Sequence, residues 1–267
     1  MPCVQSEAAS VSRCVLPHPS PLPCPHWNAT STSSNSRSPS SARRSGPPSR
    51  KPPSGSAEAL AADRWLYAFG TGHSHALAEE VFYRAGGLAR AVPILDAKLM
   101  LHDNAIEATY LEREEGYAAR LLDLYPVAAG DVLIVASNSG RNAVPIEMVL
   151  TGRARGMKTI AIVNLAHSNA WPSRHSSGKK LADVADLVID NCGVIGDARL
   201  ELPGLPGLVA STSTNTGALI VNLIIAQAVE NAIARGVTPE IYISSNTSGD
   251  AHNDVLLQKY KSRIRHL

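Results

Sequence analysis

Residues Asp131-Val-Leu-Ile-Val-Ala136 form an unbroken aliphatic run, as expected for a strand that is buried on both faces. The run leads into Ser137-Asn-Ser-Gly-Arg-Asn142, whose residue types favour turns and helix N-caps. A helical pattern follows at about 144–155, Gly156 ends it, and Lys158-Thr-Ile-Ala-Ile-Val163 is a second aliphatic strand. This order predicts a βαβ unit with parallel strands and a right-handed crossover.

The same alternation of strand and helix extends on both sides of this unit. Short apolar runs indicate further strands at 65–69, 91–95 and 187–189. Helical sequence is expected after residue 74 to about Arg84, and at 104–125, 178–184 and 214–235. We therefore predict an α/β fold for residues 57–267: a three-layer αβα sandwich around a five-stranded parallel sheet of the flavodoxin or Rossmann-like kind.

Residues 1–56 differ in composition from the rest of the chain. They contain eleven of the eighteen prolines and fifteen serines, and they show almost no apolar periodicity. Such a segment buries too little apolar surface to offset its ordering entropy, so we predict a disordered tail. An organelle transit peptide, a genuine tail and a mis-assigned start codon are all consistent with this composition.

Charge and cysteine usage exclude several classes of function. The tail carries six basic residues and one acid (+5), so the other 211 residues carry 19 basic and 22 acidic ones (−3), which disfavours nucleic-acid binding. The domain contains a single cysteine, Cys192, and the spacing of Cys14, His18, Cys24 and His26 matches no zinc pattern. No stretch approaches the ~20 apolar residues of a membrane span. We expect a cytoplasmic protein that binds no membrane. We also expect that it requires neither a metal nor a cofactor.

Three loops rich in small polar residues follow predicted strands or open a helix. They are Gly70-Thr-Gly-His-Ser-His75, Ser137–Asn142 and Ser211-Thr-Ser-Thr-Asn-Thr216. The first lacks both the G-x-G-x-x-G spacing and a P-loop lysine, which argues against a dinucleotide or a nucleoside triphosphate. Because ligands of open α/β sheets bind at the carboxyl ends of the strands, the three loops are expected to converge there on a phosphorylated, polyhydroxylated ligand.

Several motifs resemble those of the sugar isomerase (SIS) domain superfamily, in particular its uncharacterised phosphosugar-binding branch. They are Gly70–His75, Ala78-Glu-Glu-Val-Phe-Tyr-Arg-Ala-Gly-Gly87, Ser137-Asn-Ser-Gly-Arg-Asn-Ala-Val-Pro-Ile-Glu147 and Arg174-His-Ser-Ser-Gly178. The resemblance covers about three quarters of the chain. It implies a sugar phosphate held by a Ser-x-Ser-Gly-x-Thr loop, in which Asn142 replaces the usual Thr. The expected phosphosugar-binding residues are Gly70, Thr71, Gly72, Ser74, Ser137, Asn138, Ser139, Gly140, Asn142, Ser211, Thr212, Ser213 and Thr214.

Candidate catalytic residues are Glu80, His73 and His252. The resemblance implies a base on the helix after the first loop, which suits Glu80; the alternative is a surface i,i+4 pair of Glu80 with Arg84. Imidazole suits ring opening or leaving-group protonation, and His75 and His175 are weaker candidates. One branch of the superfamily has a His on its last long helix. The corresponding stretch here, 214–235, contains no His, and this departure weakens the assignment as an isomerase.

The expected function is binding of a phosphorylated sugar or amino sugar and its conversion by an isomerase or by an etherase/lyase related to N-acetylmuramic acid 6-phosphate etherase. The alternative is a non-catalytic phosphosugar sensor or regulatory SIS module, and an adaptor with a vestigial site remains a third reading. The resemblance and the apolar helix at 217–234 also predict a homodimer or tetramer.

Overall fold

The computed structural model describes residues 64–267, so the predicted tail and the Cys14 to His26 stretch lie outside the described residues. Five strands build the main sheet. They are β1 (Leu66–Gly70), β2 (Ala91–Pro93), β3 (Val132–Ala136), β4 (Lys158–Val163) and β5 (Leu187–Asp190). All neighbouring pairs are parallel, in the order β2-β1-β3-β4-β5. This is the flavodoxin-like order, and the predicted fold class is confirmed.

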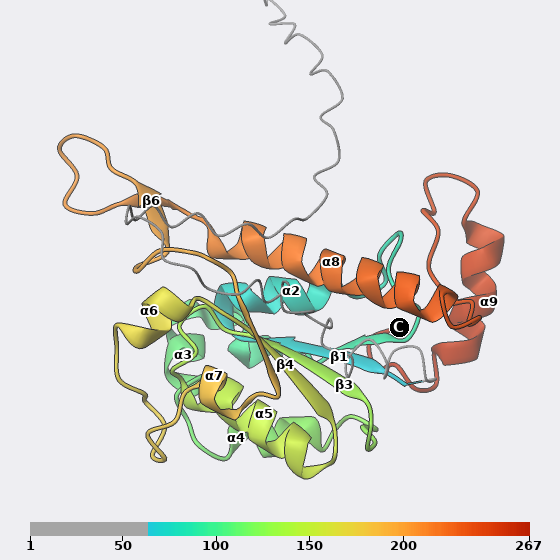
Figure 1. Ribbon diagram of the computed structural model, residues 1–267, viewed down its shortest axis with the longest axis horizontal. Coiled ribbons are helices and arrows are strands. Elements are labelled where there is room, and N and C mark those ends of the chain that lie inside the picture. The colour runs from blue at the N-terminus through green and yellow to red at the C-terminus, as the bar shows by residue number, and fades with distance from the viewer. Residues whose placement is uncertain (1–63) are drawn as a thin grey trace, which may run out of the picture. The chain divides into compact units, whose positions relative to one another are not determined.

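Helices cover both faces of this sheet (Figure 1). The longer ones are α3 (Leu101–Leu111), α5 (Ala143–Ala154), α8 (Ser213–Ile233) and α9 (Asp250–Tyr260). The shorter ones are α2 (His75–Glu80), α4 (Tyr117–Leu122), α6 (Leu165–Asn169) and α7 (Leu181–Val184), with 3-10 turns η1 (Gly72–Ser74) and η2 (Ala97–Leu99).

Side chains alternate between the two faces along each strand, which divides the core into two layers. On one face, Leu66 and Ile134 pack with α2 and with Val221 of α8. On the other, Tyr67 and Leu133 pack with α4, α5 and α7. Because both faces are covered, the strands carry the near-continuous aliphatic runs from which they were predicted.

Three elements differ from the prediction. The helix after the first loop ends at Glu80 rather than near Arg84. The expected helical stretch 104–125 breaks into α3 and α4, because Gly116 adopts a left-handed conformation (φ 81°) between them. A hairpin of β6 (Ala198–Leu200) and β7 (Val209–Ser211) was not predicted, and it projects away from the main sheet (Figure 1).

The long helix α8 is apolar on two sides. One side packs on the sheet through residues such as Val221 and Ile225, whereas Leu219 and Leu223 are 60% and 56% exposed. By length and composition α8 meets the criterion for a membrane span, and 28% of its apolar stretch is buried inside the protein. The expectation that no stretch approaches this criterion was therefore wrong for α8, whose apolar residues serve the core and an exposed face.

Candidate functional site

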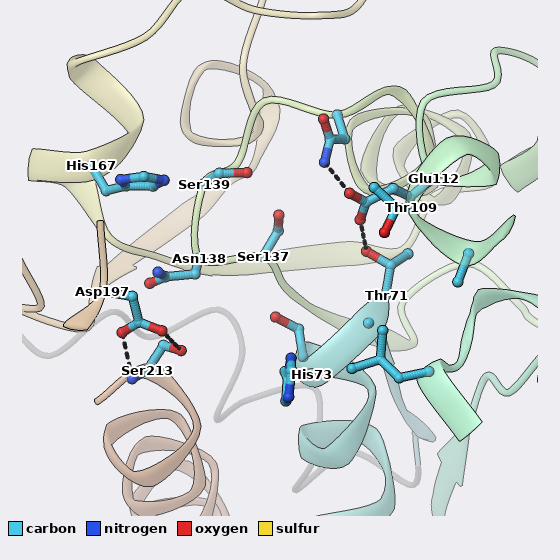
Figure 2. Close-up of a pocket in the computed structure, with 15 residues that line it drawn as sticks. Thr71, His73, Thr109, Glu112, Ser137, Asn138, Ser139, His167, Asp197 and Ser213 are labelled. Atoms are coloured by element: carbon cyan, nitrogen blue, oxygen red, sulfur yellow. Dashed lines mark hydrogen bonds between the residues drawn. The ribbon is translucent and has the colours of Figure 1, made fainter. Parts of the chain in front are cut away.

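A pocket of about 300 Å³ opens at the carboxyl ends of β1 and β3 (Figure 2). In the order β2-β1-β3-β4-β5 the chain leaves β1 and β3 toward opposite edges of the sheet, which creates a crevice between them. The residues that line the pocket are Thr71, Gly72, His73, Ser74, Leu101, Ala108, Thr109, Glu112, Ser137, Asn138, Ser139, Asn142, His167, Asp197 and Ser213.

The first loop forms one wall of this pocket. Its chain makes a tight turn directly after β1, and a Cβ at Gly70 would lie 2.2 Å from the backbone oxygen of Ser74. Glycine is therefore required at the strand end, although Gly70 itself does not line the pocket. The buried Thr71 donates a hydrogen bond from Oγ1 to Glu112 Oε2 at 2.8 Å. His73 and Ser74, predicted as a catalytic and a ligand-binding residue, also line the pocket.

The second loop forms the opposite wall. Ser137, Asn138 and Ser139 line the pocket, and the Ser137 Oγ accepts a hydrogen bond from the Gly140 amide at 3.2 Å. Gly140 has a φ of 58° and lies behind the wall, where a Cβ would come within 2.9 Å of Val163 Cγ2. It shapes the loop without lining the pocket.

Asn142, which was expected to donate to the ligand in place of Thr, lines the pocket. Its Nδ2 donates to Glu112 Oε1 at 2.6 Å, and its Oδ1 accepts from Arg174 Nη1 at 3.0 Å. Asn142 therefore holds a carboxylate that lines the pocket, and these contacts use only one of the two hydrogens of its amide nitrogen. The second hydrogen is the donor that the predicted role requires.

A further pocket residue, Glu112, was not predicted from the sequence. It caps the C-terminal end of α3 and faces the pocket (Figure 2). Burial raises the pKa of its carboxyl, while the hydrogen bond from Thr71 and the positive charges of Arg113 and Arg174 act in the opposite direction. A carboxyl with a raised pKa in an enclosed site is suited to transferring protons near neutral pH.

The third loop contributes less than expected. Of its predicted residues only Ser213 lines the pocket, whereas Ser211, Thr212 and Thr214 do not. Helix α8 begins at Ser213 with Thr212 at its N-cap position, and a residue missed from the sequence, Asp197, provides the capping carboxylate. The Asp197 carboxylate accepts from the backbone N–H of Thr212 and of Ser213 and, at 2.6 Å, from Ser213 Oγ.

This capping changes the ionisation of Asp197. Burial disfavours its charged form, but the hydrogen bonds from Ser213 and Thr212 outweigh burial and lower the pKa. The first turn of α8 is therefore occupied by a carboxylate of the protein itself. His167 also lines the pocket, its Nδ1 accepts from the Gly196 amide at 3.0 Å, and burial lowers its pKa.

Two of the three predicted catalytic residues lie outside the pocket. Glu80 is the last residue of α2, about 9 Å of helix beyond its start. It pairs with Arg84 at 3.1 Å, as the alternative reading expected, and accepts from Asn222 Nδ2 of α8 at 2.7 Å. His252 lies on α9 with its Nε2 2.9 Å from the Ile241 carbonyl oxygen. Helix α2 carries Glu80 away from the carboxyl edge of the sheet, so Glu80 is not among the residues that line the pocket.

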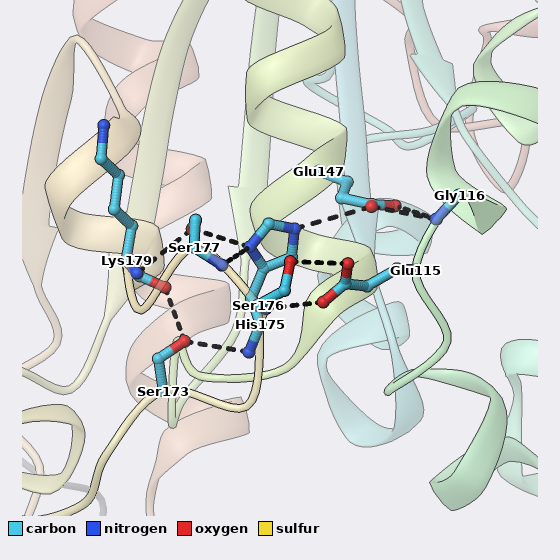
Figure 3. A network of polar contacts seen from close by, with 8 residues as sticks. All are labelled: Glu115, Gly116, Glu147, Ser173, His175, Ser176, Ser177 and Lys179. Carbon is cyan, nitrogen blue, oxygen red and sulfur yellow. Dashed lines mark hydrogen bonds and ion pairs between the residues drawn. The ribbon is translucent and has the colours of Figure 1, made fainter.

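The loop that contains His175 is fastened to its neighbours by a group of polar contacts (Figure 3). Its Nδ1 accepts from the Ser177 amide at 3.2 Å, which leaves Nε2 facing Glu147 Oε1 at 3.6 Å. Ser176 donates from its amide and from Oγ to Glu115, at 2.6 and 2.8 Å. These contacts fix residues 173–177 on α5 and on the turn that follows α3, and so fix Arg174 beside Asn142.

Comparisons with known proteins show to which family the chain belongs. A family profile described as "SIS domain" matches residues 54–164. A UPF0309 protein of Listeria monocytogenes serotype 4b is 46% identical over 209 residues, which cover 78% of this chain and 85% of the relative. A UPF0309 protein of Caldanaerobacter subterraneus is 41% identical over 211 residues, covering 78% and 86%.

Among solved structures, phosphoheptose isomerase GmhA from Neisseria gonorrhoeae is similar over 67% of this chain and 80% of its own. The sequence identity is 19% and the TM-score 0.36, so this similarity adds nothing to the topology described above. The family profile and the long matches to UPF0309 proteins carry the conclusion. The chain belongs to the UPF0309 family of SIS-domain proteins.

Proposed function

We propose that the pocket between β1 and β3 binds a phosphorylated sugar and that the protein acts on it as an isomerase or as an etherase/lyase. Membership of the SIS-domain family supports the ligand class. The position of Ser137, Asn138 and Ser139 between a strand end and the start of α5 also supports it, since hydroxyl groups and a helix N-terminus favour a phosphate. A pocket of about 300 Å³ is of the size that takes a small ligand.

The observation that carries the proposal is the partly buried Glu112, which faces the same pocket as the serine loop. We assign to Glu112 the role of base that the sequence suggested for Glu80. Its two oxygens are oriented by Thr71 and Asn142, at 2.8 and 2.6 Å. A base so placed moves a proton between C1 and C2 through an enediolate in an isomerase. In an etherase it removes the C2 proton, and the ether oxygen on C3 leaves with the electron pair of the C3–O bond and takes up a proton. His73, on the wall that the first loop forms, is the proposed proton donor for ring opening.

Turnover of a panel of hexose and N-acetylhexosamine 6-phosphates by matched glutamate variants tests this assignment. Glu112→Gln is expected to bind the substrate but to lose turnover about 10²–10⁴-fold, the usual contribution of a general base. Glu80→Gln, which loses the ion pair with Arg84 but keeps an oxygen that can accept from Asn222, is expected to stay within a few-fold of the wild type. The reverse pattern, with Glu80 essential and Glu112 dispensable, would contradict the assignment.

Binding is measured separately from turnover by thermal shift. A sugar phosphate at 100 times its Kd stabilises the folded protein by about 2.7 kcal/mol, which corresponds to roughly 5–11 °C for a domain of this size. Clear binding by the wild type without turnover of any panel member would instead support the alternative, a phosphosugar sensor. No shift with any sugar phosphate would refute the proposed ligand class.

We also propose a cytoplasmic homodimer that buries the exposed side of α8. Leu219, Leu223 and Ile233 are 60%, 56% and 61% exposed, more than is usual for large apolar residues on one helix. The exposed thiol of Cys192 fits a reducing compartment. Sedimentation is expected to give the mass of a dimer for the wild type and of a monomer for Leu219→Glu combined with Leu223→Glu. A monomeric wild type at micromolar concentration would refute the dimer.

A further inference from the structure

Three arginines neighbour the pocket residues Glu112 and Asn142, although none of the three lines the pocket itself. Arg113 directly follows Glu112 in the chain, Arg141 lies between β3 and α5, and Arg174 lies in the loop that follows α6. The Arg174 amide donates to the Arg141 carbonyl at 2.8 Å, so these two residues are adjacent across two loops. Arg174 also reaches Asn142, a residue of the pocket wall, at 3.0 Å.

Glu112 acts electrostatically on Arg113 and Arg174. None of the three arginines forms an ion pair with a carboxylate within residues 64–267, whereas Arg84, Arg120, Arg153 and Arg155 all do. Arg141 donates from Nε to the Pro172 carbonyl at 2.9 Å, which leaves its two terminal nitrogens for another acceptor. Arg113 stacks on Tyr110 at 5.5 Å, and its buried Nε has no hydrogen-bond partner in the described residues.

The three guanidinium groups also act on one another. Partial burial, and then the charges of Arg141 and Arg113, lower the pKa of Arg174. Like charges gathered in this way oppose each other, and a bound anion relieves that repulsion. The negative charge of Glu112 acts in the opposite direction on Arg174, but it is one charge beside three guanidinium groups.

A purely structural role explains only part of this arrangement. Arg174 orients Asn142, but a single neutral donor satisfies the Asn142 oxygen equally well. The Asn142 side chain bonds Glu112 and Arg174, and within residues 64–267 neither Arg113 nor Arg141 donates to it. Guanidinium groups present paired donors that match carboxylate and phosphate oxygens. The cluster therefore exceeds what is needed to hold the pocket wall.

We infer that Arg113, Arg141 and Arg174 form a second anion subsite beside Glu112, and that the ligand is a phosphorylated sugar that carries a second anionic group, a carboxylate or a second phosphate. This inference rests on the proposed function, because it assigns the first phosphate to the loop at 137–139. It narrows the substrate class from sugar phosphates in general to those with a negative charge at both ends.

Calorimetric titration with three probes tests the subsite: glucose 6-phosphate, 6-phosphogluconate and fructose 1,6-bisphosphate. The wild type is expected to bind at least one of the two doubly anionic probes tenfold or more tighter than glucose 6-phosphate, and the preference is expected to shrink as salt is raised. The carboxylate and bisphosphate probes distinguish the two kinds of second anion. Equal affinities of the wild type for all three would overturn the inference while leaving the proposed function standing.

Variants of the arginines then show which residues cause the preference for a second anion. Arg174→Gln, which keeps a donor for Asn142, and Arg113→Gln are each expected to lose the preference for the second anion tenfold or more and to change glucose 6-phosphate affinity less than threefold. Arg120→Gln, a surface arginine paired with Glu114, serves as the matched control and is expected to keep the preference. Equal weakening of all three probes by both variants would overturn the subsite. Failure of the wild type to bind any probe would overturn the proposed function and this inference together.

Discussion

Replacing Gly70 by alanine is expected to destabilise the fold and to disturb the first wall of the pocket. A Cβ at this position would lie 2.2 Å from the carbonyl oxygen and 2.4 Å from the carbonyl carbon of Ser74. Both atoms belong to the backbone of the loop at 71–74, so relief requires that the loop move. Overpacking of this kind costs typically 1–3 kcal/mol, and backbone contacts favour the upper end, about 3 kcal/mol. The melting temperature should fall by roughly 6–12 °C.

Urea denaturation of Gly70→Ala, followed by tryptophan fluorescence, measures this loss directly. Gly207→Ala is the control, because a Cβ at Gly207 would meet no heavy atom within 4 Å and the φ of this residue is outside the left-handed region. The control should stay within about 0.5 kcal/mol of the wild type. If Gly70→Ala also stayed within that margin, the close approach of the first loop to β1 would be wrong, and with it the shape of this wall.

Three further predictions concern polar groups that are buried or partly buried, and urea denaturation measures the stability in each case. Burial raises the pKa of Glu112 above its ordinary value of 4.5, so the folded state keeps the Glu112 proton to higher pH than the unfolded state does. Stability therefore falls as pH rises from 4.5 through the pKa of the folded state, and Glu112→Gln should abolish this decline. Burial lowers the pKa of His75 to about 4, so stability falls as pH drops from 6.5 to 4, and His75→Leu should lose less over that range. Asp131 accepts from the amides of Trp65 and Ala128 at 3.1 and 2.8 Å, and Asp131→Ala should cost about 1–3 kcal/mol at pH 7. A flat difference between variant and wild type across pH would contradict the first two, and an unchanged midpoint the third.

The strands and two walls of the pocket could be predicted because their signals are local. Aliphatic runs such as 132–136 must be buried on both faces of a parallel sheet, and the residues that follow them must lie at its carboxyl edge. These two facts place Thr71, His73 and Ser137 without knowledge of any other contact.

Glu112 could not be predicted in this way. It stands next to Glu114 and Glu115 in a helical stretch, and no local pattern separates the one that faces the pocket from those that face solvent. Which of these glutamates faces the pocket depends on the non-helical backbone at Asn104 and on the turn at Gly116. It also depends on the hydrogen bond that Glu112 accepts from Thr71, 41 residues earlier in the chain. Asp197 was missed for a related reason, because it acts through a hairpin that the sequence did not reveal.

That hairpin has a consequence for how association and ligand binding depend on each other. Leu200, Leu202, Leu205 and Leu208 are each about half exposed on it, and Asp197 at its base holds Ser213, which lines the pocket. If the proposed dimer contacts these leucines in addition to α8 and shifts the hairpin, it alters the pocket through a single carboxylate. Since such linkage is reciprocal, a ligand in the pocket would then change the affinity of the two copies for each other by the same factor.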